Sequence, residues 1–271
     1  MKISILMSLY IKEKARYFDE CLYSIHKQTL NPDEVVIVLD GPITLELRNV
    51  LDKWSIELNL VILPLSENIG LGKALNYGLA NCKNEYVARM DTDDICAFDR
   101  LEKQMNFFKK NPSITICGSN ITEVDGETLQ IISERNVYES HEKILEDVNR
   151  RNPFNHMTVM YRKSHILSVK SYEHLPMMED WYLWIRLLSY GYKAANINES
   201  LVIARTGKDM LERRKGIKYI KSEWLIKDAR KKYLQINPFY NFIIFIQRSI
   251  PRVLPLLLIN ILYKKKKKRM K

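Results

Sequence analysis

Short apolar runs alternate with amphipathic segments of helical length through the first 120 residues of the chain. The apolar runs have the length of buried strands and cover residues 3–8, 34–39, 60–63, 85–90 and 114–117. The segments with helical periodicity cover residues 16–28, 70–82 and 100–110. This alternation predicts an α/β fold with a mostly parallel central sheet flanked by helices, whose ligands bind at the carboxyl ends of the strands.

The pattern changes in the second half of the chain. An extended segment at 157–161 precedes an apolar helical run at 178–188, and residues 222–232 form a charged helix candidate. We therefore predict one domain over residues 1–220 and a separate helical segment over residues 221–271.

The C-terminal segment contains two apolar runs without charge, at 233–247 and 253–263, separated by Arg248 and Arg252. Neither run reaches the roughly 18 uncharged residues expected of a membrane-spanning helix. We therefore predict helices that lie in a membrane interface. A single spanning segment over about 238–263 is the alternative.

The charge distribution agrees with a membrane-associating C-terminal segment. Seven of the eight residues 264–271 are Lys or Arg, so the net charge of +11 leaves about +4 for the other 263 residues. A nucleic-acid-binding protein usually spreads its basic side chains over a docking face. A basic tail after apolar runs instead indicates an anionic membrane surface as partner, and no nucleic acid is expected.

Composition and motifs exclude several other classes of protein. A chain that is 46% hydrophobic and 28% charged is ordinary for a globular protein. The 4 cysteines lie far apart without a C-x-x-C pair, which excludes a zinc ribbon and suits a reducing cytoplasm. The apolar N-terminal run is too short for a signal peptide, so we do not expect export. Motifs of serine hydrolases, P-loop proteins and Rossmann dehydrogenases do not occur.

The strongest candidate site is the acidic segment 91–94, which follows the fourth apolar run and contains Asp91, Asp93 and Asp94. Carboxylates this close repel one another unless a cation or hydrogen-bond donors offset their charge. Hard oxygen ligands select Mg²⁺ or Mn²⁺, so we predict that Asp91 and Asp93 hold such an ion. The alternative is a solvated turn with a helix N-cap at Asp94 or Asp99.

Asp40 and Lys73 are candidates for nucleotide binding. Asp40 ends the second apolar run, where a carboxylate can accept hydrogen bonds from a base or a ribose; an Asp-Gly-Pro turn at 40–42 is the alternative. Lys73 begins the helix that follows the segment 68–72. A cation beside a helix N-terminus suits a diphosphate, and a solvated lysine is the alternative.

Glu179 and Asp180 precede a helix whose apolar face includes Trp181 and Trp184. We interpret the two tryptophans as core residues rather than a sugar-binding platform. Asp180 is a candidate general base at the edge of a cleft, with a plain N-cap as the alternative. His156 is either an acid or base or a structural hydrogen-bonding residue.

Arg205, Arg213 and Arg214 belong to a basic segment that also contains Gly207 and Gly216. Glycines beside arginines are typical of a mobile lid over phosphate groups. A solvated basic loop is the alternative interpretation.

In this order, the segments resemble an inverting family 2 glycosyltransferase of the GT-A fold, from the bacterial O-antigen and exopolysaccharide branch. The resemblance covers roughly residues 1–220 and is carried by segments 4–10, 21–28, 36–41, 68–78, 88–94, 98–104, 152–158 and 179–180. One departure is Leu39, which stands where the family often has the first of two paired acids. Asp40 is therefore the single candidate for contact with the base.

On the donor side, the resemblance implies that Asp40 hydrogen-bonds a uracil and that Lys73 lies near the nucleotide. It implies that Asp91 contacts the ribose or the metal. It also implies that Asp93 coordinates a Mn²⁺ or Mg²⁺ ion that bridges the diphosphate.

On the acceptor side, the resemblance implies that Asp180 takes the proton from the acceptor hydroxyl, with Glu179 supporting it. Arg205, Arg213 and Arg214 would close over the diphosphate. A single well-placed base fits inversion at the anomeric carbon better than a double displacement.

The function implied is transfer of a hexose, glucose or galactose, from a UDP-sugar to an N-acetylhexosamine (GlcNAc or GalNAc) on undecaprenyl diphosphate. The product would be β-linked, and the enzyme would be peripheral at the cytoplasmic face of the bacterial inner membrane.

Two alternatives belong to other classes. A nucleotide-sugar pyrophosphorylase should carry a Gly-rich N-terminal loop, and residues 7–16 contain no glycine. A non-enzymatic membrane or nucleic-acid binder would use the basic tail and would not need Asp40, Asp91 and Asp93.

Overall fold

The computed structural model describes residues 1–206 and 216–253. The chain divides into two compact units, one of Met1–His174 with Glu179–Gly207 and one of Leu175–Met178 with Lys208–Lys271. The domain boundary at residue 220 stays a prediction, since residues 207–215 lie outside the described part of the chain.

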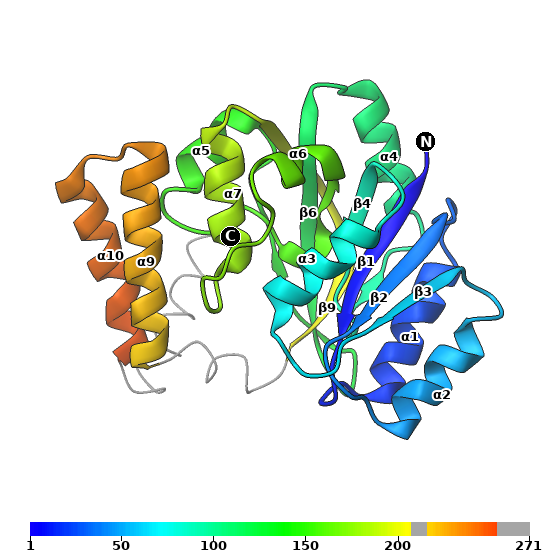
Figure 1. The fold of residues 1–271 in the computed structure, drawn as a ribbon. Coiled ribbons are helices and arrows are strands. Elements are labelled where there is room, and N and C mark those ends of the chain that lie inside the picture. The colour runs from blue at the N-terminus through cyan, green and yellow to red at the C-terminus, as the bar shows by residue number, and fades with distance from the viewer. Residues whose placement is uncertain (207–215, 254–271) are drawn as a thin grey trace. The chain divides into compact units, whose positions relative to one another are not determined.

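The first unit is built on a nine-stranded sheet with the order β3-β2-β1-β4-β8-β6-β9-β5, and β7 pairs with β6 (Figure 1). The strands are β1 (Ile3–Leu9), β2 (Glu34–Leu39), β3 (Leu60–Pro64), β4 (Tyr86–Arg89), β5 (Ile95–Cys96), β6 (Ile114–Asp125), β7 (Ile131–Arg135), β8 (Met160–Arg162) and β9 (Lys193–Thr206).

The two halves of this sheet are paired differently. β3, β2, β1 and β4 run parallel, as the alternation of elements predicts. β8 is antiparallel to both β4 and β6, β9 is parallel to β6, and β5 and β7 are antiparallel to their partners. The predicted α/β fold is confirmed. The sheet is parallel throughout β3, β2, β1 and β4, and its other half is mixed, with β6 and β9 as a parallel pair.

Helices cover both faces of the parallel half. The helices of this unit are α1 (Ala15–His26), α2 (Leu45–Trp54), α3 (Leu71–Asn81), α4 (Arg100–Lys110), α5 (His141–Asp147), η1 (His156–Thr158), α6 (Lys163–Ser168) and α7 (Glu179–Ser189). One core contains alternate residues of β1 (Ile3, Ile5, Met7) and side chains of α1, α2 and α4. Figure 1 shows α3 on the opposite side of β1 and β2 from α1 and α2.

Close packing of α3 on the sheet depends on Gly78. A Cβ atom at Gly78 would lie 2.4 Å from Leu6 Cδ1 and 2.7 Å from Val38 Cγ2. Because both faces of β2 are covered, all six of its residues are buried, which explains its nearly continuous apolar sequence.

The second unit contains the helical hairpin of α9 (Ile217–Leu234) and α10 (Pro238–Val253). Gln235 ends α9 in the left-handed conformation, with φ of 51°. The side chain of Asn237 accepts hydrogen bonds from the backbone N–H groups of Phe239 (3.0 Å) and Tyr240 (3.2 Å) and so caps α10.

The predicted C-terminal helical extension is therefore present. Within residues 1–206 and 216–253, none of the helices is both long and apolar enough to cross a membrane. The remainder of the alternative spanning segment, 254–263, lies outside the described residues.

Candidate active site

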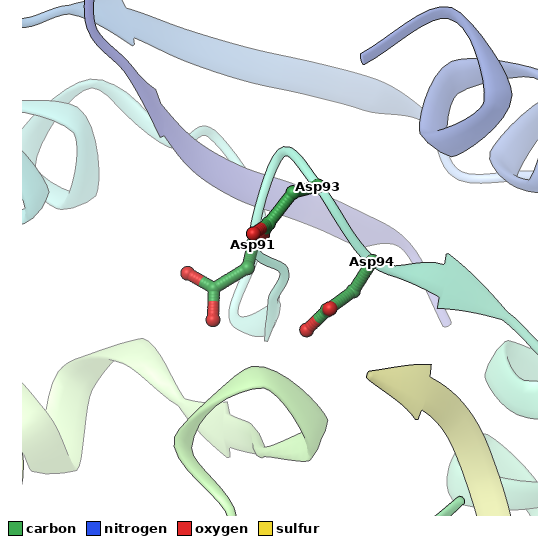
Figure 2. Close-up of side chains that lie close together, drawn as sticks. All are labelled: Asp91, Asp93 and Asp94. Carbon is green, nitrogen blue, oxygen red and sulfur yellow. The ribbon is translucent and has the colours of Figure 1, made fainter. Parts of the chain in front are cut away.

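The acidic segment 91–94 forms a turn immediately after β4, at the carboxyl edge of the parallel strands. β1 pairs with β4 on one side and with β2 on the other, so this turn and Asp40 are at the same edge of the sheet. Figure 2 shows the side chains of Asp91, Asp93 and Asp94 extending to one side of the turn. Local sequence and topology thus place the candidate donor-site carboxylates where ligands bind in such sheets.

The three carboxylates of this turn form one cluster, with an oxygen atom of each within 4.8 Å of the others. Burial, together with the negative charges of Asp91 and Glu13, raises the pKa of Asp93 to about 7. Burial and the charges of Asp93 and Asp91 also raise the pKa of Asp94 well above its ordinary value. The cluster therefore favours a bound positive charge, either protons or a cation.

Asp94 has a carboxylate oxygen that is available to coordinate a metal ion. Its Oδ1 atom accepts a hydrogen bond from the backbone N–H of Arg205 at 2.9 Å. Its Oδ2 atom is buried without a hydrogen-bond partner. An unused carboxylate oxygen beside two further carboxylates is a hard donor set that suits Mg²⁺ or Mn²⁺. Asp94 therefore joins Asp91 and Asp93 as a candidate ligand, whereas the sequence pattern indicated only Asp91 and Asp93.

Arg205, at the end of β9, supports the acidic turn from within the protein. Its guanidinium donates to the backbone carbonyl of Asp93 and pairs with the carboxylate of Glu20. The guanidinium also lies over the ring of Tyr17, 4.5 Å from its centroid. The role of Arg205 toward a diphosphate stays a prediction. Arg213 and Arg214 lie outside the described residues.

Arg89 is a site residue that sequence reasoning missed. It is the last residue of β4, it is 2% exposed, and its guanidinium pairs with the carboxylate of Asp91. Its Nε and Nη1 atoms are buried without hydrogen-bond partners. The available signal was a charged residue between the apolar residues 86–88 and Met90 of the predicted strand, because a charge is rarely buried without a partner.

The carboxylate of Asp40 binds the loop that leads into α3. Its Oδ1 accepts from the backbone N–H of Ile69 at 2.7 Å, and its Oδ2 accepts from that of Gly70 at 3.2 Å. Gly41 makes the approach possible, since it has φ of +90° and a Cβ atom there would lie 2.9 Å from the backbone nitrogen of Asn68. Lys73 is exposed on the first turn of α3. Asp40 and the N-terminus of α3 are thereby brought together.

Asp180 lies half-buried in the first turn of α7. Its carboxylate accepts hydrogen bonds from Asn152 Nδ2 and, at 2.7 Å, from the backbone N–H of Trp181. Burial raises the pKa of Asp180, and the positive charge of Arg89 opposes part of this effect. Asp180 is therefore a carboxylate with raised basicity and a fixed orientation, within electrostatic reach of the residue that pairs with Asp91.

Glu179 contacts α3 beside the predicted nucleotide-binding segment. A Cβ atom at Gly72 would lie 3.1 Å from Glu179 Cγ, so any larger residue would require this side chain to shift. The first turn of α7 and the first turn of α3 are therefore in contact. The structure brings Glu179 next to the helix that carries Lys73.

His156 and the two tryptophans have structural surroundings. His156 Nε2 lies 2.8 Å from the hydroxyl of Tyr172, and burial with the charge of Arg89 lowers the pKa of the imidazole well below its ordinary value. His156 is thus a neutral hydrogen-bonding residue. Trp181 and Trp184 are 2% and 0% exposed, which confirms that they are core residues.

An α/β sheet with a parallel N-terminal half, an acidic turn at the carboxyl edge and a second carboxylate at the start of α7 define a glycosyltransferase of the GT-A fold. The chain belongs to the family described as "Glycosyl transferase family 2", whose model matches residues 4–175.

Individual proteins support this assignment. The chain is 40% identical to the amylovoran biosynthesis glycosyltransferase AmsE of Erwinia amylovora, over 98% of this chain and 99% of the relative. It is 38% identical to the UDP-Gal:alpha-D-GlcNAc-diphosphoundecaprenol beta-1,3-galactosyltransferase of Escherichia coli, over 97% of this chain and 96% of the relative. Among solved structures, residues 1–349 of S. aureus TarS, in complex with UDP-GlcNAc, share the fold with a TM-score of 0.69 at 22% identity, covering 92% of this chain and 72% of that one.

Family membership decides between the alternatives from the sequence. The chain is a glycosyltransferase, and neither the pyrophosphorylase nor the non-enzymatic binder agrees with the family match. The predicted family, fold and class of reaction are confirmed.

Proposed function

We propose that the chain is a metal-dependent, inverting hexosyltransferase of O-antigen or related polysaccharide assembly. Its donor is UDP-glucose or UDP-galactose, and its acceptor is an N-acetylhexosamine on undecaprenyl diphosphate. The donor and acceptor in the name of the E. coli relative support these two classes of substrate. The observation that carries the proposal is the cluster of three carboxylates at the carboxyl edge of the sheet.

The donor side of the proposal uses the acidic turn and the loop before α3. Asp91, Asp93 and Asp94 would hold Mn²⁺ or Mg²⁺, which when bound offsets the negative charge of the diphosphate leaving group. Asp40 keeps the segment 68–70 against the end of β2, where its carboxylate can also accept from a uracil N–H. Lys73 is the candidate cation for the phosphates.

The acceptor side uses Asp180 as the general base. A sugar hydroxyl is a weak nucleophile at neutral pH, so its proton must pass to a base as the new bond forms. Asn152 orients the carboxylate of Asp180 through its amide group. Glu179 supports this turn from its position against α3. One displacement at the anomeric carbon converts an α-linked donor into a β-linked product.

The location proposed for the enzyme is the cytoplasmic face of the bacterial inner membrane. The acceptor class is lipid-linked, and seven basic residues among 264–271 provide attraction to anionic lipids. A peripheral position would bring the site to an acceptor that does not leave the bilayer.

The test is UDP release from a panel of UDP-sugars, with a synthetic lipid-diphosphate N-acetylhexosamine as acceptor. We expect acceptor-dependent release with one donor in the presence of Mn²⁺ or Mg²⁺, and loss of release in EDTA. Release that persists in EDTA would contradict metal dependence. An α-linked product, identified by NMR of the anomeric proton, would contradict inversion.

A further inference from the structure

A helix on the surface of a water-soluble protein usually exposes polar side chains and buries apolar ones. Helix α10 shows the opposite arrangement. The side chains exposed on α10 are mainly apolar, with exposed fractions of 75% for Phe239, 48% for Phe242, 36% for Ile243, 39% for Ile246 and 51% for Ile250. Their spacing of i, i+3, i+4, i+7 and i+11 places them in one row along the helix. Tyr240 and Gln247 border this row, which we call the outer face of α10.

Three polar side chains of α10, those of Asn241, Arg248 and Arg252, point inward, to α9. Arg248 donates to both carboxylate oxygens of the fully buried Glu223, through Nε at 2.7 Å and Nη2 at 2.8 Å. Arg252 is within 3.9 Å of the same carboxylate. Asn241, 2% exposed, donates to the backbone carbonyl of Lys227 at 2.7 Å. Helix α10 therefore turns its charged side chains toward α9 and leaves aromatic and aliphatic side chains exposed.

Exposed apolar residues that form a contiguous row mark a contact surface for a membrane or for another protein, whereas apolar residues scattered singly do not. The distribution of charge around the row favours a membrane. The outer face contains no acidic residue, and the chain beyond α10 ends in seven basic residues among 264–271. In an anionic phospholipid membrane, an apolar layer of lipid chains lies beneath a layer of negatively charged headgroups. The apolar row of α10 is complementary to the first layer, and the basic residues among 264–271 are complementary to the second.

We propose that α10 lies parallel to an anionic membrane surface and inserts its outer face among the lipid chains. The exposed lysines of α9, among them Lys231 and Lys232, remain at the level of the headgroups or in water. This inference rests on the proposed function in one respect: an enzyme whose acceptor is lipid-linked must reach the membrane, and α10 would attach it there. It also identifies which residues make the contact, separately from the electrostatic attraction of the tail.

The test is flotation of the full-length chain with phosphatidylcholine vesicles that contain phosphatidylglycerol, in 0.15 M and 0.5 M salt, without donor or acceptor. The variant is Phe242→Gln with Ile250→Gln, since glutamine keeps helix propensity and both side chains are about half exposed. The matched control is Ile56→Gln, which removes an 84% exposed side chain from the first unit. Circular dichroism and the melting temperature establish that each variant is folded.

We expect the parent chain and the Ile56→Gln control to bind the vesicles equally, with part of the binding retained at 0.5 M salt, where tail electrostatics are screened. The double variant should bind at least about 10-fold more weakly, because two apolar side chains no longer enter the lipid. Equal binding of the double variant and the parent would overturn the proposal.

A second outcome would also overturn it. If the parent forms a dimer in light scattering without vesicles, and the double variant is a monomer, the outer face is a contact between two copies of the chain. Because vesicle binding requires neither donor nor acceptor, failure of the glycosyl-transfer assay and failure of this proposal are distinguishable.

Discussion

At the scale of single residues, the candidate site contains more carboxylates than positive charges to offset them. Three carboxylates lie on one turn, and Arg89 pairs with one of them, Asp91. Burial of the remaining two raises their pKa values, so keeping both carboxylates ionised costs free energy unless a cation offsets their charge. A bound divalent cation would offset this charge, and this is why we propose metal and diphosphate binding for the cluster.

Replacing Asp93 by alanine removes a candidate ligand from this cluster without removing a packed core side chain. We expect Asp93→Ala to lower turnover by at least about 10²-fold, with the melting temperature of the metal-free protein unchanged or raised. UDP release at saturating metal, together with thermal denaturation, measures both. Near-normal turnover would contradict the assignment of Asp93.

Asp180 is tested by its pH dependence. A general base acts when deprotonated, so the rate should rise with pH through the pKa of Asp180, which burial places above the ordinary carboxyl value. We expect Asp180→Ala to lower turnover by at least about 10²-fold and to remove this acidic limb from the pH–rate profile. An unchanged limb in the variant would assign it to another group.

At the scale of elements, function depends on where strands end. β2 and β4 end at the same edge because both pair in parallel with β1. The segment 68–70 is drawn to this edge by Asp40, and that approach requires Gly41. Turn geometry therefore decides how the predicted nucleotide-binding helix α3 is oriented.

Gly41 and Gly70 form a matched pair for testing this turn. Both have positive φ, +90° and +89°, but a Cβ atom at Gly41 would lie 2.9 Å from the backbone nitrogen of Asn68, whereas a Cβ atom at Gly70 would meet nothing within 4 Å. Gly70 has φ of 89° and ψ of 153°, a region that is essentially restricted to glycine, so we expect Gly70→Ala to cost about 1–3 kcal/mol of unfolding free energy for conformation alone. Gly41→Ala should cost at least about 1 kcal/mol more. Urea denaturation measures both, and equal costs would show that the close approach is unimportant.

At the scale of the whole molecule, metal binding should be linked to folding stability and to pH. The pKa of Asp93 is about 7 in the folded chain and ordinary in the unfolded one. Without metal, the folded state therefore binds a proton more tightly, and stability is lost as pH rises from about 4 to 7. A bound divalent cation reverses this loss.

We expect the rise in melting temperature produced by Mg²⁺ to be larger at pH 7.5 than at pH 5.5, because protons compete with the ion at the lower pH. UDP added with Mg²⁺ should increase the rise further. Differential scanning fluorimetry measures these shifts, with Asp93→Asn as the control in which the pH dependence of the metal effect is reduced. A metal effect independent of pH would contradict the link to Asp93.

Sequence patterns predicted much of the fold and part of the site. The five apolar runs up to residue 117 all became strands, and the acidic turn follows β4 where it was expected. The helix α2 was not predicted, and β6 extends to Asp125, well beyond the apolar run 114–117. Pairing of β6 with β7, β8 and β9 sustains that strand through polar residues, and such long-range pairing leaves no local signal.

The sequence by itself determined the class of fold, the family and the candidate acids for the chemistry, because these depend on local periodicity and on motifs in a fixed order. Only the tertiary structure decided which groups meet. It placed Asp94 among the candidate ligands, Arg89 beside Asp91, and Glu179 against α3. It also showed that α10 turns its charges toward Glu223 and its apolar row outward. The contacts of Glu179 and of Glu223 join residues that are far apart in the chain. Packing and electrostatic interactions depend on the distance between atoms in the folded protein, which the local sequence does not show.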